Sequence, residues 1–97
     1  MTQEIRERSL KCIIAAASPR ALEDLVAPID HAHLDFSDRR ILSRDAMVVH
    51  SSATPEQIRD ALMPLLDLGA SLVVVEFERW SSYGVEVDVE WLLRRGH

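Results

Sequence analysis

The hydrophobic positions of the chain fall into blocks of two periods, which predicts strands alternating with helices. Leu10–Ala17 is a short continuous apolar run, typical of a central strand buried on both faces. Its alanines also permit a helix that continues from Glu4, and this stays the alternative. From His31 to Asp38 the period is two, which predicts a half-buried strand. Ala32, Leu34 and Phe36 share its apolar face.

Two other segments have the period and the start signals of helices. Ser18-Pro19 offers a hydroxyl cap and a proline at the first helical position. The buried stripe of this helix would be Leu22, Leu25, Val26 and Ile29. Thr54–Gln57 is a capping box that contains a proline, so a second helix is expected to start there. Its stripe would be Ile58, Ala61, Leu62, Leu65 and Leu66. Pro64 is expected to kink this helix and Gly69 to end it.

The remaining apolar blocks predict further strands. Ile41–Ser51 would follow a turn at residues 38–40, Ser71–Trp80 is β-branched and aromatic, and Val85–Trp91 alternates strictly after a loop at residues 81–84. The order is β-α-β-β-α-β with an extra C-terminal strand. It predicts an α+β fold of the ferredoxin-like split βαβ type, with helices on one face of an antiparallel sheet.

Composition and charge narrow the classes of function. The 97 residues are 47% hydrophobic and 28% charged, which predicts one folded domain over residues 1–97. A net charge of −5 disfavours direct binding of nucleic acid, which depends on Lys and Arg. Cys12 is the single cysteine, so we expect no disulfide and a reducing cytoplasm. The apolar runs are shorter than the roughly 20 residues of a membrane span, so no membrane association is expected.

The segment Ser52–Trp80 reads SATPEQIRDALMPLLDLGASLVVVEFERW and is followed by a closing WLL at Trp91–Leu93. It resembles the C-terminal half of the small ferredoxin-like proteins related to the CRISPR adaptation subunit and the VapD-type toxins. The resemblance implies the fold and a homodimer formed through sheet edges. Nuclease members of that group carry a metal-binding aspartate at the end of the first strand. Ala15–Ser18 occupies that position here and has no carboxylate.

The C-terminal hairpin predicted above is unusually acidic. Glu86, Asp88 and Glu90 would share one face of the last strand, about 6.6 Å apart, and Glu76 and Glu78 would extend the row on the preceding strand. The row is either the solvated face of a hairpin or a mimic of nucleic acid that docks into a basic protein surface. The aromatic residues here are either interface anchors or core. They are Trp80, Tyr83 and Trp91.

Motifs for catalysis or cofactor binding are sparse, and we expect no cofactor. His31, His33 and Asp35 have the i, i+2, i+4 spacing of a metal site on a strand, or of a plain polar face. The leading hypothesis is a non-enzymatic protein-interaction or regulatory domain that acts as a homodimer. One alternative is an acidic inhibitor that mimics nucleic acid. The other is a metal-dependent nuclease relative with Asp35, Asp38 and Asp45 as ligands.

Overall fold

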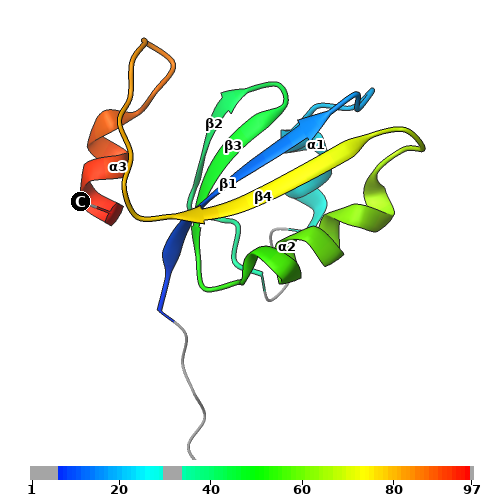
Figure 1. The fold of residues 1–97 in the computed structure, drawn as a ribbon, viewed down its shortest axis with the longest axis horizontal. Helices are drawn as coiled ribbons and strands as arrows, with labels where there is room; N and C mark the ends of the chain where they lie inside the picture. Colours follow the sequence, from blue (N-terminus) through cyan, green and yellow to red (C-terminus); the bar gives the residue numbers. More distant parts are fainter. Residues whose placement is uncertain (1–6, 30–33, 97) are drawn as a thin grey trace, which may run out of the picture.

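The chain folds as an α+β protein, as predicted, around one four-stranded antiparallel sheet (Figure 1). The structure is a computed structural model that describes residues 7–29 and 34–96. The strands are β1 (Ser9–Ala16), β2 (Arg39–Ser43), β3 (Ala46–Ser51) and β4 (Ser71–Phe77), in the spatial order β2-β3-β1-β4. The helices are α1 (Leu22–Val26), α2 (Pro55–Leu62) and α3 (Val89–Gly96), and two 3₁₀ turns, Ala27–Ile29 and Met63–Leu65, follow α1 and α2.

Strand β1 lies in the middle of the sheet and is hydrogen-bonded on both sides. It pairs with β3 from Ser9↔Ser51 to Ile14↔Ala46, and with β4 from Leu10↔Phe77 to Ala16↔Ser71. The strand expected over Leu10–Ala17 is therefore confirmed and the helical alternative is wrong. A continuous apolar run suits this place because side chains on both faces of the central strand enter a hydrophobic cluster.

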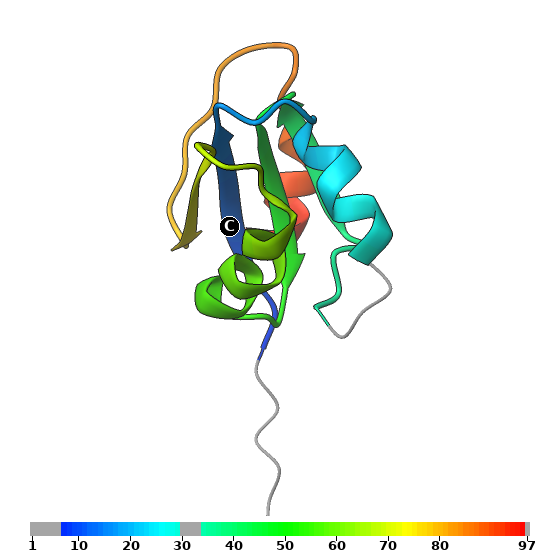
Figure 2. The ribbon, with the colours of Figure 1, turned by 90° about the vertical axis from the view of Figure 1, so that its right-hand side faces the viewer.

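Two hydrophobic clusters lie on opposite faces of the sheet. Ile13 and Ala15 of β1 belong to the larger cluster, under α1 and α2. Leu10, which points the other way along the strand, packs against Trp91 and Leu92 of α3. Figure 2 shows α1 and α2 near the viewer and α3, in red, behind the strands. We call the side toward which Leu10 points the open face, because α3 covers only part of it.

The strand predicted over His31–Asp38 is wrong. Residues 30–33 lie outside the described residues, and the chain from Leu34 to Asp38 forms no strand. Asp35 has φ 58°, a left-handed conformation that does not fit a strand. Leu34 and Phe36 are nevertheless buried, 6% and 0% exposed, as the alternation predicted. The alternation therefore identified two core side chains, although the segment that carries them is irregular and not a strand.

The first β-hairpin is formed one segment later than predicted. Residues 38–40 were expected to turn, but β2 begins at Arg39, and the turn is at Arg44-Asp45 between β2 and β3. Ile41–Ser51 is therefore two strands and not one. The Arg39 guanidinium forms a bidentate ion pair with the Glu23 carboxylate of α1, with Nε–Oε1 at 2.8 Å and Nη2–Oε2 at 2.5 Å. The charged residues at 38–40 therefore do not form the predicted turn, and Arg39 instead forms an ion pair between β2 and α1.

Helix α1 buries the predicted residues but starts later than expected. Leu22, Leu25 and Val26 are all buried, as the stripe predicted. The N-cap is Ala21, without a side-chain hydrogen bond, and the Ser18 hydroxyl donates to the Arg20 carbonyl oxygen at 2.8 Å. The expected serine cap is thus wrong, because a local turn uses that hydroxyl.

Helix α2 begins with the predicted capping box. The Gln57 amide donates to Thr54 Oγ1 at 3.1 Å, and the Thr54 amide donates to Gln57 Oε1 at 2.8 Å. Ile58 and Leu62 are fully buried in the larger cluster. The helix ends at Leu62, and Pro64 lies in the 3₁₀ turn that follows. Gly69 has φ 94°, in the turn before β4.

Replacing Thr54 by alanine should lower the free energy of unfolding by about 1 kcal/mol, because the Gln57 amide loses the hydroxyl oxygen that accepts its hydrogen bond. Equilibrium urea denaturation of the wild type, Thr54→Ala and Thr54→Ser measures this. The serine variant keeps the hydroxyl and should retain most of the stability. Equal loss in both variants would show that the threonine methyl group, and not the cap, is responsible.

Candidate functional site

The segment predicted as the last strand is instead a loop that leads into α3. Residues 85–88 have no regular structure and α3 begins at Val89. Asp88 caps this helix, because its Oδ1 accepts the Trp91 amide at 3.1 Å. Glu90 lies in the first turn, and Arg94 and Arg95 lie in the last, as the helix dipole favours. These end signals, in the run DVEWLLRR, could have identified the helix from the sequence.

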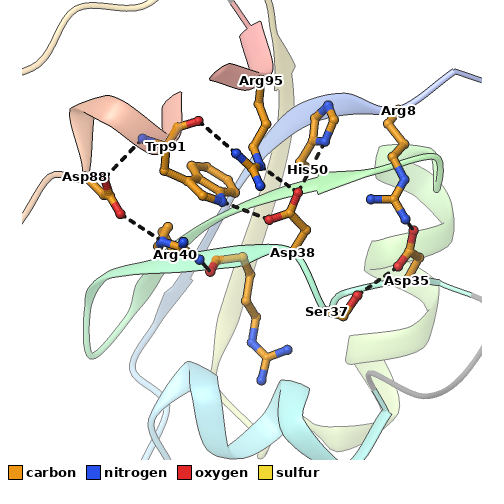
Figure 3. A network of polar contacts seen from close by, with 10 residues as sticks. Arg8, Asp35, Ser37, Asp38, Arg40, His50, Asp88, Trp91 and Arg95 are labelled. Atoms are coloured by element: carbon orange, nitrogen blue, oxygen red, sulfur yellow. Dashed lines mark hydrogen bonds and ion pairs between the residues drawn. The ribbon is translucent and has the colours of Figure 1, made fainter. Parts of the chain in front are cut away.

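Trp91 attaches α3 to the sheet and is the centre of the candidate site (Figure 3). Its side chain is fully buried and packs against Leu10 and Val48 of the open face. The guanidinium carbons of Arg40 and Arg95 lie 5.2 and 4.9 Å from its ring centroid, within the range of cation–π attraction. Of the two roles considered for Trp91, interface anchor or core residue, the structure shows the core residue. Its ring is buried and is not available to a partner.

Asp38, directly before β2, collects the polar contacts of this region. Its Oδ1 accepts the Trp91 indole N–H at 2.8 Å, and its Oδ2 accepts the Arg95 Nε–H at 2.6 Å. Burial alone would raise the pKa of the Asp38 carboxyl, but the hydrogen bonds from Arg95 and Trp91 outweigh it and hold the pKa below its usual value. The carboxylate form of Asp38 thus binds α3 to the sheet.

His50 of β3 completes the group. Its Nδ1 lies 3.5 Å from Asp38 Oδ2, and the two side chains are only 17% and 21% exposed. Burial lowers the pKa of His50. Asp38 opposes this shift, and the positive charges of Arg8 and Arg95 add to it. The histidine is therefore kept neutral to a lower pH than a free imidazole.

The second ion pair under α3 joins Arg40 and Asp88. Arg40 Nε lies 3.0 Å from Asp88 Oδ2, and the hydrogen bonds from Arg40 and from the Trp91 amide lower the pKa of the Asp88 carboxyl. Asp88 thus has two structural roles, a cap and a link to β2. The site consists of Asp38, Arg40, His50, Asp88, Trp91 and Arg95, of which the sequence had singled out Asp38, Asp88 and Trp91, each for another role.

The structure does not bring the five predicted acidic residues into one row. Glu76 lies on β4 and Glu78 follows it, Glu86 lies in the loop, and Asp88 and Glu90 lie at the start of α3. The shared strand face that suggested mimicry of nucleic acid is therefore wrong. Partner binding by these acidic residues stays a prediction, but it loses its geometric argument. Of the other aromatics, Trp80 packs beside the α3 cluster and Tyr83 is 99% exposed.

A buried lysine forms a second polar cluster, on the helix face. The Lys11 side chain is 0% exposed, and its Nζ donates to Ser9 Oγ at 2.7 Å and to the Ser51 carbonyl oxygen at 2.6 Å. Glu76 Oε2 lies 3.5 Å from this Nζ and accepts the Ser9 hydroxyl at 2.5 Å. The ammonium group has three donors and three nearby acceptors, so its burial is compensated. This cluster is explained as a structural ion pair across β1 and β4.

The three carboxylates named for a nuclease are each engaged by an arginine. Asp35 pairs with Arg8, Asp38 with Arg95, and Asp45 with Arg44. Within residues 7–29 and 34–96, no group of three or more His, Cys, Asp or Glu side chains could hold a metal ion. His31 and His33 lie outside the described residues. A metal at Asp38 would have to displace both Arg95 and Trp91.

Comparison with known proteins gives no relative: no family model, no curated protein and no solved structure matches the chain. The resemblance to the CRISPR-adaptation and VapD-type group therefore stays a prediction. No helix in the described part of the chain has the length and apolarity needed to cross a membrane.

Removing the charge of Asp38 should destabilise the protein by about 1–3 kcal/mol, because Arg95 is left without its charged acceptor beside the buried indole. Urea denaturation of Asp38→Asn at neutral pH measures this. Asp35→Asn is the matched control, since it removes an arginine-paired carboxylate at a more exposed pair and should change stability by less than about 1 kcal/mol. Similar effects of the two substitutions would contradict the role given to Asp38.

Replacing Lys11 by methionine should also destabilise, because the carboxylate of Glu76 and the Ser51 carbonyl lose a buried partner while the volume is kept. The double variant Lys11→Met/Glu76→Gln should recover part of the loss, since the carboxylate that faced the ammonium group is neutralised as well. A double-mutant cycle from urea denaturation gives the coupling. Strictly additive effects would refute an ion pair between the two side chains.

Proposed function

We propose that this chain is a non-enzymatic protein-interaction domain of ferredoxin-like type that acts as a homodimer through the edge of β4. The ferredoxin-like assignment is supported by the strand order β2-β3-β1-β4, with α1 between β1 and β2 and α2 between β3 and β4. The observation that supports a dimer is a contrast between the two edge strands of the sheet, β2 and β4. Only β2 has the features that prevent pairing with another strand.

Strand β4 is an edge that invites another strand. It is seven residues long, it pairs with β1 without a register shift, and it carries no charge before Glu76. Val73 and Val75 are 53% and 44% exposed. A long, regular, β-branched edge strand presents unpaired N–H and C=O groups to solvent and is a template for pairing with another chain.

Strand β2, at the opposite edge, has the features that block pairing. It has five residues, its register with β3 shifts between Ile41 and Ser43, and it starts with two arginines. Bulges and charged side chains are the usual means by which an exposed edge avoids another strand. The proposed interface is therefore on the β4 side.

A second copy of the chain is the occupant that fits this edge best. Two β4 strands can pair antiparallel about a two-fold axis, which merges two sheets and closes the assembly at two copies. On the open face, Val73 and Val75 of both copies would then meet beside Ile14, which is 45% exposed and opposite Val73 in the β1–β4 register. These three side chains form an uncharged patch, so a protein of net charge −5 can contact its own copy there.

The wild type should sediment as a dimer at micromolar concentration, and the variant Val73→Lys/Val75→Lys should sediment as a monomer. Four lysines would approach each other across the two-fold axis, while exposed positions tolerate the change within each copy. Analytical ultracentrifugation over a dilution series gives the dissociation constant. Ile41→Lys is the control, because Ile41 is 50% exposed on the other edge strand, and it should leave the dimer unchanged.

A wild type that sediments only as an 11.0 kDa species would overturn the proposal. So would dissociation by Ile41→Lys together with an intact dimer of the double lysine variant, since the interface would then lie on β2.

A further inference from the structure

The C-terminal arm, residues 78–96, is attached to the domain in an unusual way. Residues 78–88 form a loop without regular structure that stands off the sheet (Figure 1). Two backbone hydrogen bonds of this loop are local: the Val87 N–H donates to the Gly84 carbonyl oxygen, and the Val89 N–H donates to the Val87 carbonyl oxygen. The contacts of α3 with the sheet are made by side chains, chiefly those of Trp91, Leu92 and Arg95. Such an arm can leave the sheet without breaking a strand pairing.

The rest of the core does not depend on the arm. The larger cluster, under α1 and α2, contains no residue of α3. The smaller cluster consists of Leu10 and Val48 from the sheet and Trp91 and Leu92 from α3, with partly buried neighbours. Since the two clusters lie on opposite faces, release of α3 exposes one side of the sheet and leaves the other packed. Local opening of this kind costs less free energy than global unfolding, because the larger cluster stays packed.

Two ion pairs link α3 to the sheet, and a third lies nearby. Asp38 pairs with Arg95, Asp88 with Arg40, and Asp35 with Arg8. His50 faces Asp38 from the loop before β2, Arg8 from the segment before β1, and Arg95 from α3. Arg94 lies close enough to lower the pKa of the Asp88 carboxyl as well. A proton on His50 adds a positive charge to a group in which Arg8 and Arg95 already oppose it. Its Nδ1 then competes with Arg95 for Asp38 Oδ2.

We propose that α3 is an acid-released clasp: protonation of His50 at the Asp38–Arg95–Trp91 junction detaches α3 and uncovers Leu10 and Val48 of the open face while the sheet stays folded. Once uncovered, Leu10 and Val48 form one apolar surface with Cys12, which is opposite Val48 in the β1–β3 register and two residues from Leu10. Cys12 is opposite Val75 on the other side. The apolar surface available on the open face therefore grows from its β4 side across to β3.

The direction of the pH effect follows from the proton affinities of the two states. With α3 docked, burial and the positive charges of Arg8 and Arg95 hold the pKa of His50 below that of a free imidazole. Release removes Arg95 and exposes the ring, so the released state binds the proton more tightly. Docking is therefore strongest above the ordinary histidine value of about 6.5 and weakens as the pH falls through it. The pKa of Asp38 is lowered too, so its contribution is lost only at more acidic pH, near and below about 4. The first step of release belongs to His50.

The experiment uses Trp80→Phe, in which Trp91 is the only tryptophan. Acrylamide quenching of its fluorescence is followed from about pH 8 to pH 5, with circular dichroism of the sheet and the NMR titration of His50 recorded on the same samples. We expect quenching to rise several-fold, with a midpoint that coincides with the His50 titration, and the sheet signal to be kept. In His50→Gln the rise should be absent above about pH 5. In His50→Lys, which carries a permanent charge, Trp91 should be quenched already at pH 8.

Three results would overturn the proposal. Trp91 could stay protected in the wild-type background down to pH 5, the rise could persist in His50→Gln, or the sheet signal could be lost in the same step. If His50→Gln does not fold, the His50→Lys variant and the coincidence of the wild-type titrations still decide. These readouts do not depend on the oligomeric state, so they are independent of the dimer proposed above.

Discussion

The pairing of β1 on both of its sides is the constraint on which the rest of this structure depends. A strand in the middle of a four-stranded sheet must bury side chains on both faces, so α1 and α2 cover one face and α3 part of the other. Lys11 interrupts the apolar run of this strand, and a buried ammonium is costly without partners. Ser9, Ser51 and Glu76 supply them from β1, β3 and β4. The polar cluster thus fixes the same three strands that the apolar side chains pack.

The partial cover of the open face links the two proposals. α3 is too short to cross the sheet, and it leaves Ile14, Val73 and Val75 about half exposed. An antiparallel sheet can keep one face in water, but that face is then usually polar. Here it is apolar beside β4 and covered by α3 beside β2 and β3. In the two proposals this surface is functional, because a second copy covers it at the β4 edge and α3 covers and releases the remainder.

Trp91 shows how an aromatic residue can be strongly buried while its attachment stays sensitive to charge. The indole packs against apolar side chains, but its N–H is bound to Asp38 and the guanidinium groups of Arg40 and Arg95 lie over its ring. Within the described part of the chain, every buried side-chain nitrogen and oxygen has a hydrogen-bond partner. A satisfied junction of this kind is stable as long as its hydrogen bonds and ion pairs stay in place. A change in one proton therefore affects the whole junction.

The sequence by itself determined the elements whose signals are local. The capping box at Thr54–Gln57 predicted the start of α2, because a cap is a contact within four residues. The apolar run of Leu10–Ala17 predicted the central strand, because such a run can be read in adjacent residues. Alternation failed where tertiary contacts decide. Val85–Trp91 alternates, yet the Asp88 cap and the packing of Trp91 on the open face select a helix. His31–Asp38 alternates too, yet the left-handed Asp35 excludes a strand there. The site joins residues from the loop before β2, from β3 and from α3. Only the folded chain brings these residues together. Asp38 and Trp91 are 53 residues apart in the sequence, and no local pattern encodes a contact over that distance. The same holds for the charged groups around His50.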